Sequence, residues 1–219
     1  MKKLLIPAIC LIPMLSVCTA CNAKTDYFEY VSELRSEIYC YQDDQVSLKI
    51  YCAQRETPYA LDGVKGAMTD LCEVYFESVT PANEVEIALL GHEGEMNYLA
   101  VTRNFYLSFG AEKANLTSVP VEITVDGKQY SYDVPSVGRE GVIDPKVALK
   151  CVTEYDAESF DALKSGNSFS GEISVRLLYD GGCFYYVGLC DRQGNVHAYL
   201  LNAGDGRVIA ERESQAEIK

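Results

Sequence analysis

The chain has 219 residues, with 32 acidic and 19 basic side chains and a formal net charge of −13 at pH 7. An acidic surface repels phosphate groups, so the composition disfavours nucleic-acid binding and membrane attachment through a basic patch. Hydrophobic residues make up 48% of the sequence. That content is enough for one or two domains with their own cores and argues against wholesale disorder.

The first twenty residues have the order of a secretory signal, which is positive, then apolar, then small. Lys2 and Lys3 precede an apolar run over residues 4–17, and Thr19 and Ala20 follow it. The run is shorter than the ~20 residues that a membrane-spanning helix needs, and no later segment comes close. The sequence therefore predicts an exported chain whose mature form has no transmembrane span.

The end of this signal resembles the lipobox of bacterial lipoproteins, in which a small residue precedes the cysteine that receives the lipid. Ala20-Cys21 fits that step, although Cys18 stands where the lipobox usually has Leu. The alternatives are lipidation at Cys18, after Val17, or a plain secretory signal. The resemblance implies a protein anchored through Cys21 to the outer face of the bacterial cell membrane, with residues 21–25 as the lipidated tether.

Six cysteines follow Cys21, and an even count in an exported chain permits disulfides. Their spacing is irregular and matches no zinc motif, and most lie in apolar, strand-like runs. This favours buried thiols over disulfides but leaves the pairing open. Cys183 and Cys190 cannot bond each other, because seven residues along one strand separate them by ~23 Å. The six are Cys40, Cys52, Cys72, Cys151, Cys183 and Cys190.

Residues 26–135 are predicted to form a β-rich domain. Asp26–Ile38 combines helical spacing with a capping box, which predicts a short helix leading into a strand. Alternating or β-branched runs then follow at close spacing with little helix between them, as is typical of an antiparallel β-sandwich or meander. These predicted strands are residues 46–52, 71–79, 85–89, 96–101 and 105–109.

The clearest local prediction is a hairpin over Val121–Asp133. Asp126-Gly127 is a favoured pair for a type I′ turn, because both central residues must adopt positive φ. Pairing outward from this turn separates a largely apolar face from a polar one, so register and hydrophobic pattern agree. The predicted pairs are Val125–Lys128, Ile123–Tyr130 and Val121–Tyr132.

Residues 136–141 have the composition of a linker, and residues 142–213 are predicted to form a small α+β module before a polar tail at 214–219. A helix over Asp156–Lys164 precedes four runs separated by glycine-containing turns, which predicts a four-stranded antiparallel meander. The whole chain is thus expected to be mainly β with minor α. The four strands are residues 173–179, 184–190, 196–201 and 207–211.

The last hairpin, from Gly194 to Val208, is similar to the end of PepSY-type modules. These are small helix-and-sheet domains of exported bacterial proteins and peptidase propeptides. The family has Asp where this chain has Asn202, and the glycines that follow are shifted. The resemblance covers the last third of the chain at most, and it implies a regulatory or interaction module rather than a catalytic one.

No catalytic, cofactor-binding or metal motif is found, and no catalytic residue, cofactor or metal is predicted. His92 lies in a predicted turn over residues 91–94, and a solvated turn residue is favoured over a metal or proton-transfer site. His197 shares a strand face with Tyr199, and a hydrogen-bonded histidine is favoured there over a catalytic one. Two polar turns could hold calcium, but ordinary turn chemistry explains both. They contain Asp43-Asp44 and Asp191 with Asn195.

The chain has 16 tyrosines and no tryptophan. Tyrosine suits a binding face because its ring buries area while its hydroxyl stays hydrated, although it also suits ordinary strands. A tyrosine-bearing face in the C-terminal module is therefore the candidate docking surface. Its residues are Tyr179, Tyr185, Tyr186, Tyr199 and His197.

These observations favour a non-enzymatic cell-envelope lipoprotein that binds a protein or peptide partner. One alternative is a ligand-binding module for glycans or peptides, which predicts a concave aromatic pocket. Another is a hydrolase with two carboxylates, which predicts two acids facing one cleft, one of them with a raised pKa.

Overall fold

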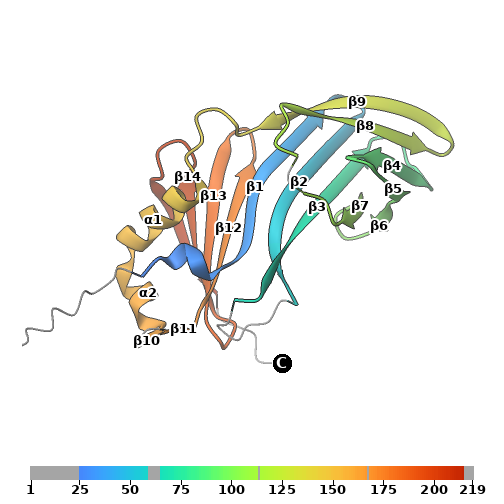
Figure 1. Ribbon diagram of the computed structural model, residues 1–219. Coiled ribbons are helices and arrows are strands. Elements are labelled where there is room, and N and C mark those ends of the chain that lie inside the picture. The colour runs from blue at the N-terminus through green and yellow to red at the C-terminus, as the bar shows by residue number, and fades with distance from the viewer. Residues whose placement is uncertain (1–24, 59–64, 113, 167, 215–219) are drawn as a thin grey trace, which may run out of the picture.

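The computed structural model in Figure 1 describes residues 25–58, 65–112, 114–166 and 168–214. It is mainly β with minor α, as the sequence predicts. In chain order the elements are η1 (Tyr27–Tyr30), β1 (Val31–Gln42), β2 (Val46–Thr57), β3 (Ala67–Ser78), β4 (Val85–Leu89), β5 (His92–Glu95), β6 (Asn97–Leu99), β7 (Asn104–Phe109), β8 (Ser118–Val125), β9 (Lys128–Val137), α1 (Pro145–Tyr155), α2 (Ala157–Ala162), β10 (Lys164–Ser165), β11 (Ser168–Phe169), β12 (Glu172–Tyr179), β13 (Cys183–Cys190), β14 (Val196–Asn202) and β15 (Val208–Ser214).

One strongly curved sheet carries most of the strands (Figure 1). Its main path runs β15-β14-β13-β12-β1-β2-β3-β7-β6, and β1 pairs with β12 in parallel. The predicted C-terminal meander is confirmed, since β12, β13, β14 and β15 are antiparallel neighbours in that order. Strands β4, β5, β8 and β9 branch from the path, and β9 joins the second half of β1.

The predicted hairpin is confirmed residue by residue in β8 and β9. Val125 pairs with Lys128, and the next pairs outward keep the expected register. Asp126 and Gly127 have φ angles of 47° and 78°, as a type I′ turn requires. The Asp126 carboxylate also accepts hydrogen bonds from the backbone N–H groups of Asn83 and Glu84, so it ties the turn to the start of β4.

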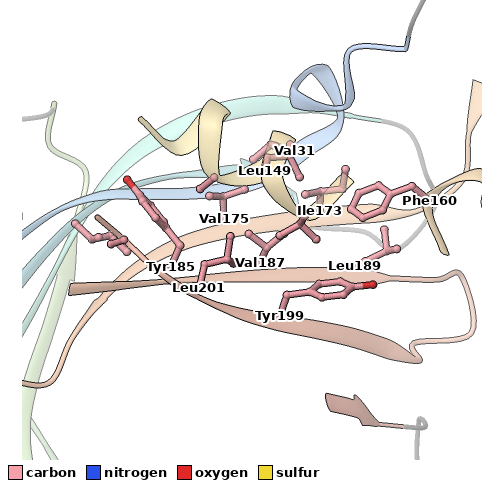
Figure 2. Packing of buried hydrophobic residues seen from close by; sticks show 14 of the residues in the cluster. Val31, Leu149, Phe160, Ile173, Val175, Tyr185, Val187, Leu189, Tyr199 and Leu201 are labelled. Atoms are coloured by element: carbon pink, nitrogen blue, oxygen red, sulfur yellow. The ribbon is translucent and has the colours of Figure 1, made fainter. Parts of the chain in front are cut away.

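Two hydrophobic cores lie side by side along the sheet. In the first, named the helix core, α1, α2 and η1 cover β12, β13 and β14. Figure 2 shows Leu149 and Phe160 facing strand side chains such as Ile173, Val187 and Tyr199. In the second, named the sandwich core, β4, β8 and β9 cover β1, β2 and β3, with Leu48, Ile50, Cys52, Cys72, Val74, Phe76, Val85, Ile87, Val119, Val121 and Ile123 among its buried residues.

Three local features differ from the sequence prediction. Helix α1 was not predicted from the sequence. The Asp144 side chain caps it by accepting a hydrogen bond from the Lys146 N–H, and Pro145 is its first residue. The helix predicted from Asp26 is only the 3₁₀ turn η1, because the chain becomes extended at Val31. The turn predicted over residues 91–94 lies earlier, at Leu90 and Gly91, which both have positive φ. His92 therefore begins β5.

The two predicted segments of the chain share one sheet. Strand β9 extends through Val137, into the residues predicted as a linker. Strand β1, from the first segment, pairs with β12 from the second, and Val31 of β1 is buried in the helix core. In the described part of the chain, no helix has the length and apolar character needed to cross a membrane. The signal and Cys21 lie outside the described residues.

Candidate functional site

Alternation along β12 separates an apolar side from a polar one. Ile173, Val175 and Leu177 are buried in the helix core. Glu172 and Arg176 therefore point to the opposite side of the sheet, since successive strand residues face opposite ways. The registers extend this polar side over five strands, β13, β12, β1, β2 and β3. We call it the open face, and it carries Glu33, Arg35, Tyr51, Arg55, Glu73, Tyr75, Arg176 and Tyr186.

The sandwich core lies on the other side of β2 and β3 from the open face. On β2, Ile50 and Cys52 are buried in the sandwich core while Tyr51 between them points away. On β3, Cys72 and Val74 are likewise buried, and Glu73 lies between them. On β2 and β3 the open face is thus the side that the sandwich core does not cover, and Tyr51 on this face packs against residues of the helix core.

A chain of alternating charges crosses the open face. Arg176 of β12 donates two hydrogen bonds to the Glu33 carboxylate of β1, at 2.9 and 2.6 Å. Arg55 of β2 lies 3.4 Å from Glu33 and 3.5 Å from Glu73 of β3. Arg35 completes the chain, 3.6 Å from Glu73. Four neighbouring strands therefore contribute to one continuous ionic network.

Two arginines favour the ionised form of the buried Glu33. Burial alone would raise its pKa, because a low-dielectric site disfavours the charged form. The hydrogen bonds and positive charges of Arg176 and Arg55 outweigh that effect and hold the pKa below its ordinary value. Glu33 is therefore an ionised partner of two guanidinium groups, which suits positioning rather than proton donation.

Tyrosine rings lie beside the ionic network and pack against its arginines. The Arg35 guanidinium lies 4.3 Å from the centre of the Tyr51 ring, a cation–π contact. Tyr51 contacts Tyr75 edge to face at 5.7 Å between ring centres, and Tyr75 contacts Tyr106 of β7 at 5.0 Å. These contacts hold long side chains in fixed positions on the open face.

Two hollows lie on the open face. The larger, of about 600 Å³, is lined by Glu33, Arg55, Glu172, Arg176 and Tyr186 among others. The smaller, of about 300 Å³, contains Arg35, Lys49, Tyr51 and Tyr75 in its lining. Glu33 of the larger hollow and Arg35 of the smaller are two residues apart on β1, or about 7 Å along the strand.

The larger hollow brings two carboxylates together, which is one of the features that a two-carboxylate hydrolase predicts. Glu33 and Glu172 both line it, and each residue is only 5% exposed. Such a hydrolase also needs a general acid with a raised pKa. The pKa of Glu33 is shifted in the other direction, so this residue does not meet that requirement.

The five residues predicted as a docking surface do not form one accessible surface. Tyr185 and Tyr199 are buried in the helix core, where their hydroxyls donate to the Ile143 carbonyl and to Asp156. His197 stacks on Tyr199 with 4.5 Å between ring centres, on the same side of β14. Tyr186 points the other way because it follows Tyr185 directly on β13. Tyr179, at the end of β12, is 36% exposed.

The structure places the histidines and the acidic turns among hydrogen-bonding and packing partners of the chain itself. His197 Nδ1 lies within hydrogen-bond distance of Ser159 and Tyr199. The Asp43 and Asp191 carboxylates accept backbone N–H groups of their own turns. His92 is exposed on β5 and packs against Phe109. Among the described residues, no group of three or more His, Cys, Asp or Glu side chains is arranged to hold a metal ion.

Comparison with known proteins gives no relative from which a role could be transferred. No protein-family profile matches the chain, and neither the curated proteins nor the solved structures contain a significant match.

Proposed function

We propose that this chain is an exported lipoprotein whose open face binds an extended peptide segment of a protein partner. The observation that carries the proposal is the row of arginines and tyrosines that crosses β13, β12, β1, β2 and β3 on one face. Export and anchoring through Cys21 are supported by the N-terminal sequence alone. The proposed role is binding, not catalysis.

Residue type and rigidity both support binding at this face. Arginine and tyrosine are enriched among the residues that dominate binding energy at protein interfaces. Here Arg55 and Arg176 keep 36% and 37% of their side-chain surface exposed while their positions are fixed by Glu33. A partner therefore meets donors that are already ordered, which lowers the entropy lost on binding.

Charge balance further supports a peptide ligand. Arg35, Arg55 and Arg176 share this face with three glutamates, in a chain that is otherwise strongly acidic; these are Glu33, Glu73 and Glu172. The open face thus repels an acidic peptide less than the rest of the surface does. Its guanidinium and carboxylate groups can pair with peptide carbonyl and N–H groups.

A glycan is the less favoured ligand because arginines pack over the tyrosine rings. The guanidinium group of Arg35 lies over Tyr51, and that of Arg176 lies 5.5 Å from the ring centre of Tyr186. A sugar that stacks on an aromatic ring needs the same ring faces. A peptide can instead use the exposed nitrogen donors of the arginines.

Site-specific photo-crosslinking in the native bacterium tests the proposal. A photoreactive residue at Tyr186 or Tyr75 should capture a protein partner, and mass spectrometry should locate the crosslink in one segment of it. The controls are Val147 on α1 and Val101 in the turn before β7, which are 45% and 98% exposed but lie off the open face. Equal capture at all four positions, or capture only at the controls, would contradict the proposal.

Protein from the same bacterium also tests whether the chain is anchored through a lipid on Cys21. In protein purified from the membranes of that bacterium, the mass of the N-terminal peptide should show a cleaved chain that begins at a lipid-modified Cys21. An unmodified Cys21 in soluble protein would refute anchoring without affecting the crosslinking result.

A further inference from the structure

Cys52 and Cys72 lie directly opposite each other in the antiparallel pair of β2 and β3. Both side chains are in the sandwich core, with exposures of 1% and 0%. Residues opposite each other in an antiparallel pair have Cα atoms about 4.5–5.5 Å apart. That separation falls within the range of about 4.4–6.8 Å that a disulfide spans.

The two thiols already contact each other. A hydrogen bond joins the Cys72 and Cys52 side chains, so the sulfur atoms face each other across the strands. This bond and the burial of Cys72 raise the pKa of its thiol far above the ordinary value, and the folded protein therefore disfavours its thiolate.

No other cysteine of the described strands has a cysteine opposite it. Cys40 is paired with Lys49, and Cys183 with Tyr179. Cys190 lies between Glu172 and Val196 of its two neighbouring strands. Cys151 is on helix α1. The Cys52–Cys72 pair is thus distinguished by register from the other cysteines of these elements.

We propose that Cys52 and Cys72 form a structural disulfide in the exported protein. One thiolate attacks an external disulfide, either of a small molecule or of an exchange protein, and forms a mixed disulfide while one thiol leaves. The second cysteine then attacks the protein sulfur of that bond and releases the second thiol. The two cysteines are oxidised, the external disulfide is reduced, and the two thiol protons end on the released thiols.

The burial of both residues determines when this exchange takes place. The thiolate is the attacking species, and the closed sandwich core disfavours it and shields it from the external disulfide. The bond therefore forms before β4, β8 and β9 close over β2 and β3. Once formed, it is protected from reductants in the native protein.

The disulfide would also stabilise the pairing of β2 and β3, two of the strands that carry the open face. Tyr51 and Glu73 are the chain neighbours of Cys52 and Cys72, and they point to the opposite side of the same two strands. A covalent link between β2 and β3 fixes the register in which Arg55 meets Glu73. The disulfide does not depend on peptide binding, so either proposal can fail without the other.

Peptide mapping of the full chain, recovered from its exporting cells, tests the proposal. The protein is quenched in acid, denatured, alkylated with N-ethylmaleimide without reduction, and digested with trypsin. Cleavage after Lys49, Arg55, Lys65 and Arg103 gives peptides 50–55 and 66–103, each with one cysteine. The expected product is the two peptides joined, two hydrogens lighter than their sum, which reduction separates.

The Cys40→Ala variant should give the same joined peptide, because Cys40 lies outside the pair. The Cys72→Ala variant should give peptide 50–55 alkylated at Cys52. If the wild-type protein yields both peptides separately, each carrying one maleimide, the proposal is overturned. It is equally overturned if Cys52 is found joined to another cysteine.

Discussion

Glu33 is buried between the guanidinium groups of Arg55 and Arg176, whose positive charges balance its carboxylate. Its pKa lies below the ordinary value of 4.5. A carboxyl group with a lower pKa in the folded than in the unfolded state stabilises the protein while it is ionised in both states. That contribution is present above the unfolded pKa and is lost as pH falls through the folded one.

We therefore expect Glu33→Gln to destabilise the protein at neutral pH by about 1–2 kcal/mol. This is less than a fully buried pair would lose, because both arginines are more than a third exposed and water screens them. As pH falls below the ordinary carboxyl pKa, Glu33 of the unfolded wild type takes up a proton, so the difference between variant and wild type should shrink; it should be lost once pH lies below the lowered pKa of folded Glu33.

Urea unfolding at about pH 7 and about pH 3 measures both effects. Glu140→Gln is the matched control, because Glu140 is exposed, and it should change little at either pH. A destabilisation by Glu33→Gln that is the same at both pH values would show that its charge is not what the arginines stabilise.

At the level of elements, two glycines in hairpin turns differ in their backbone φ angle. Gly127, in the turn between β8 and β9, has a φ of 78°, which strains any residue with a Cβ. Gly182, in the turn between β12 and β13, lacks a positive φ, and an added Cβ would meet only ordinary contacts with Phe184. Turn position alone therefore does not predict which glycine the fold requires.

Gly127→Ala should lower the free energy of unfolding by about 1–2 kcal/mol, whereas Gly182→Ala should change it by less than about 0.5 kcal/mol. Thermal or urea unfolding of the two variants beside the wild type provides the measurement. Equal effects of the two substitutions would refute the explanation through φ.

The separation in sequence between interacting residues explains which parts of the structure could be predicted from the sequence. The register of β8 and β9 follows from the turn at Asp126-Gly127 and from alternation over a few residues, so it was predictable. Helix α1 had a local signal, an Asp144 cap followed by Pro145, but its apolar face, Ala148, Leu149 and Val152, is short. The 3₁₀ form of η1 depends on the early start of β1.

The open face was not predictable, because its strands come from distant parts of the chain. The Ser32 hydroxyl donates to the Ile173 carbonyl across a separation of 141 residues. The alternation of Glu172, Ser174 and Arg176 is visible in the sequence, but nothing local indicates that β1 is the neighbour of β12. Without that pairing, Glu33 cannot be matched to Arg176.

Strand β1 links the two cores at the level of the whole molecule. Its residues Val31 and Ile38 belong to the helix core, and Tyr39 belongs to the sandwich core. Unfolding of either core removes a partner from β1 and so weakens the other. We therefore expect one cooperative transition for the whole chain, with equal calorimetric and van't Hoff enthalpies.

A matched pair of substitutions tests this coupling. Ile50 and Ile173 are both fully buried, one in each core. Ile→Val at either position should cost about 0.5–1.5 kcal/mol. Each variant should lower one common melting temperature by about 2–4 °C per kcal/mol, as for other chains of this size. Two separate transitions, with Ile50→Val shifting one and Ile173→Val the other, would instead show that β1 does not couple the cores, because each would then unfold without weakening its neighbour.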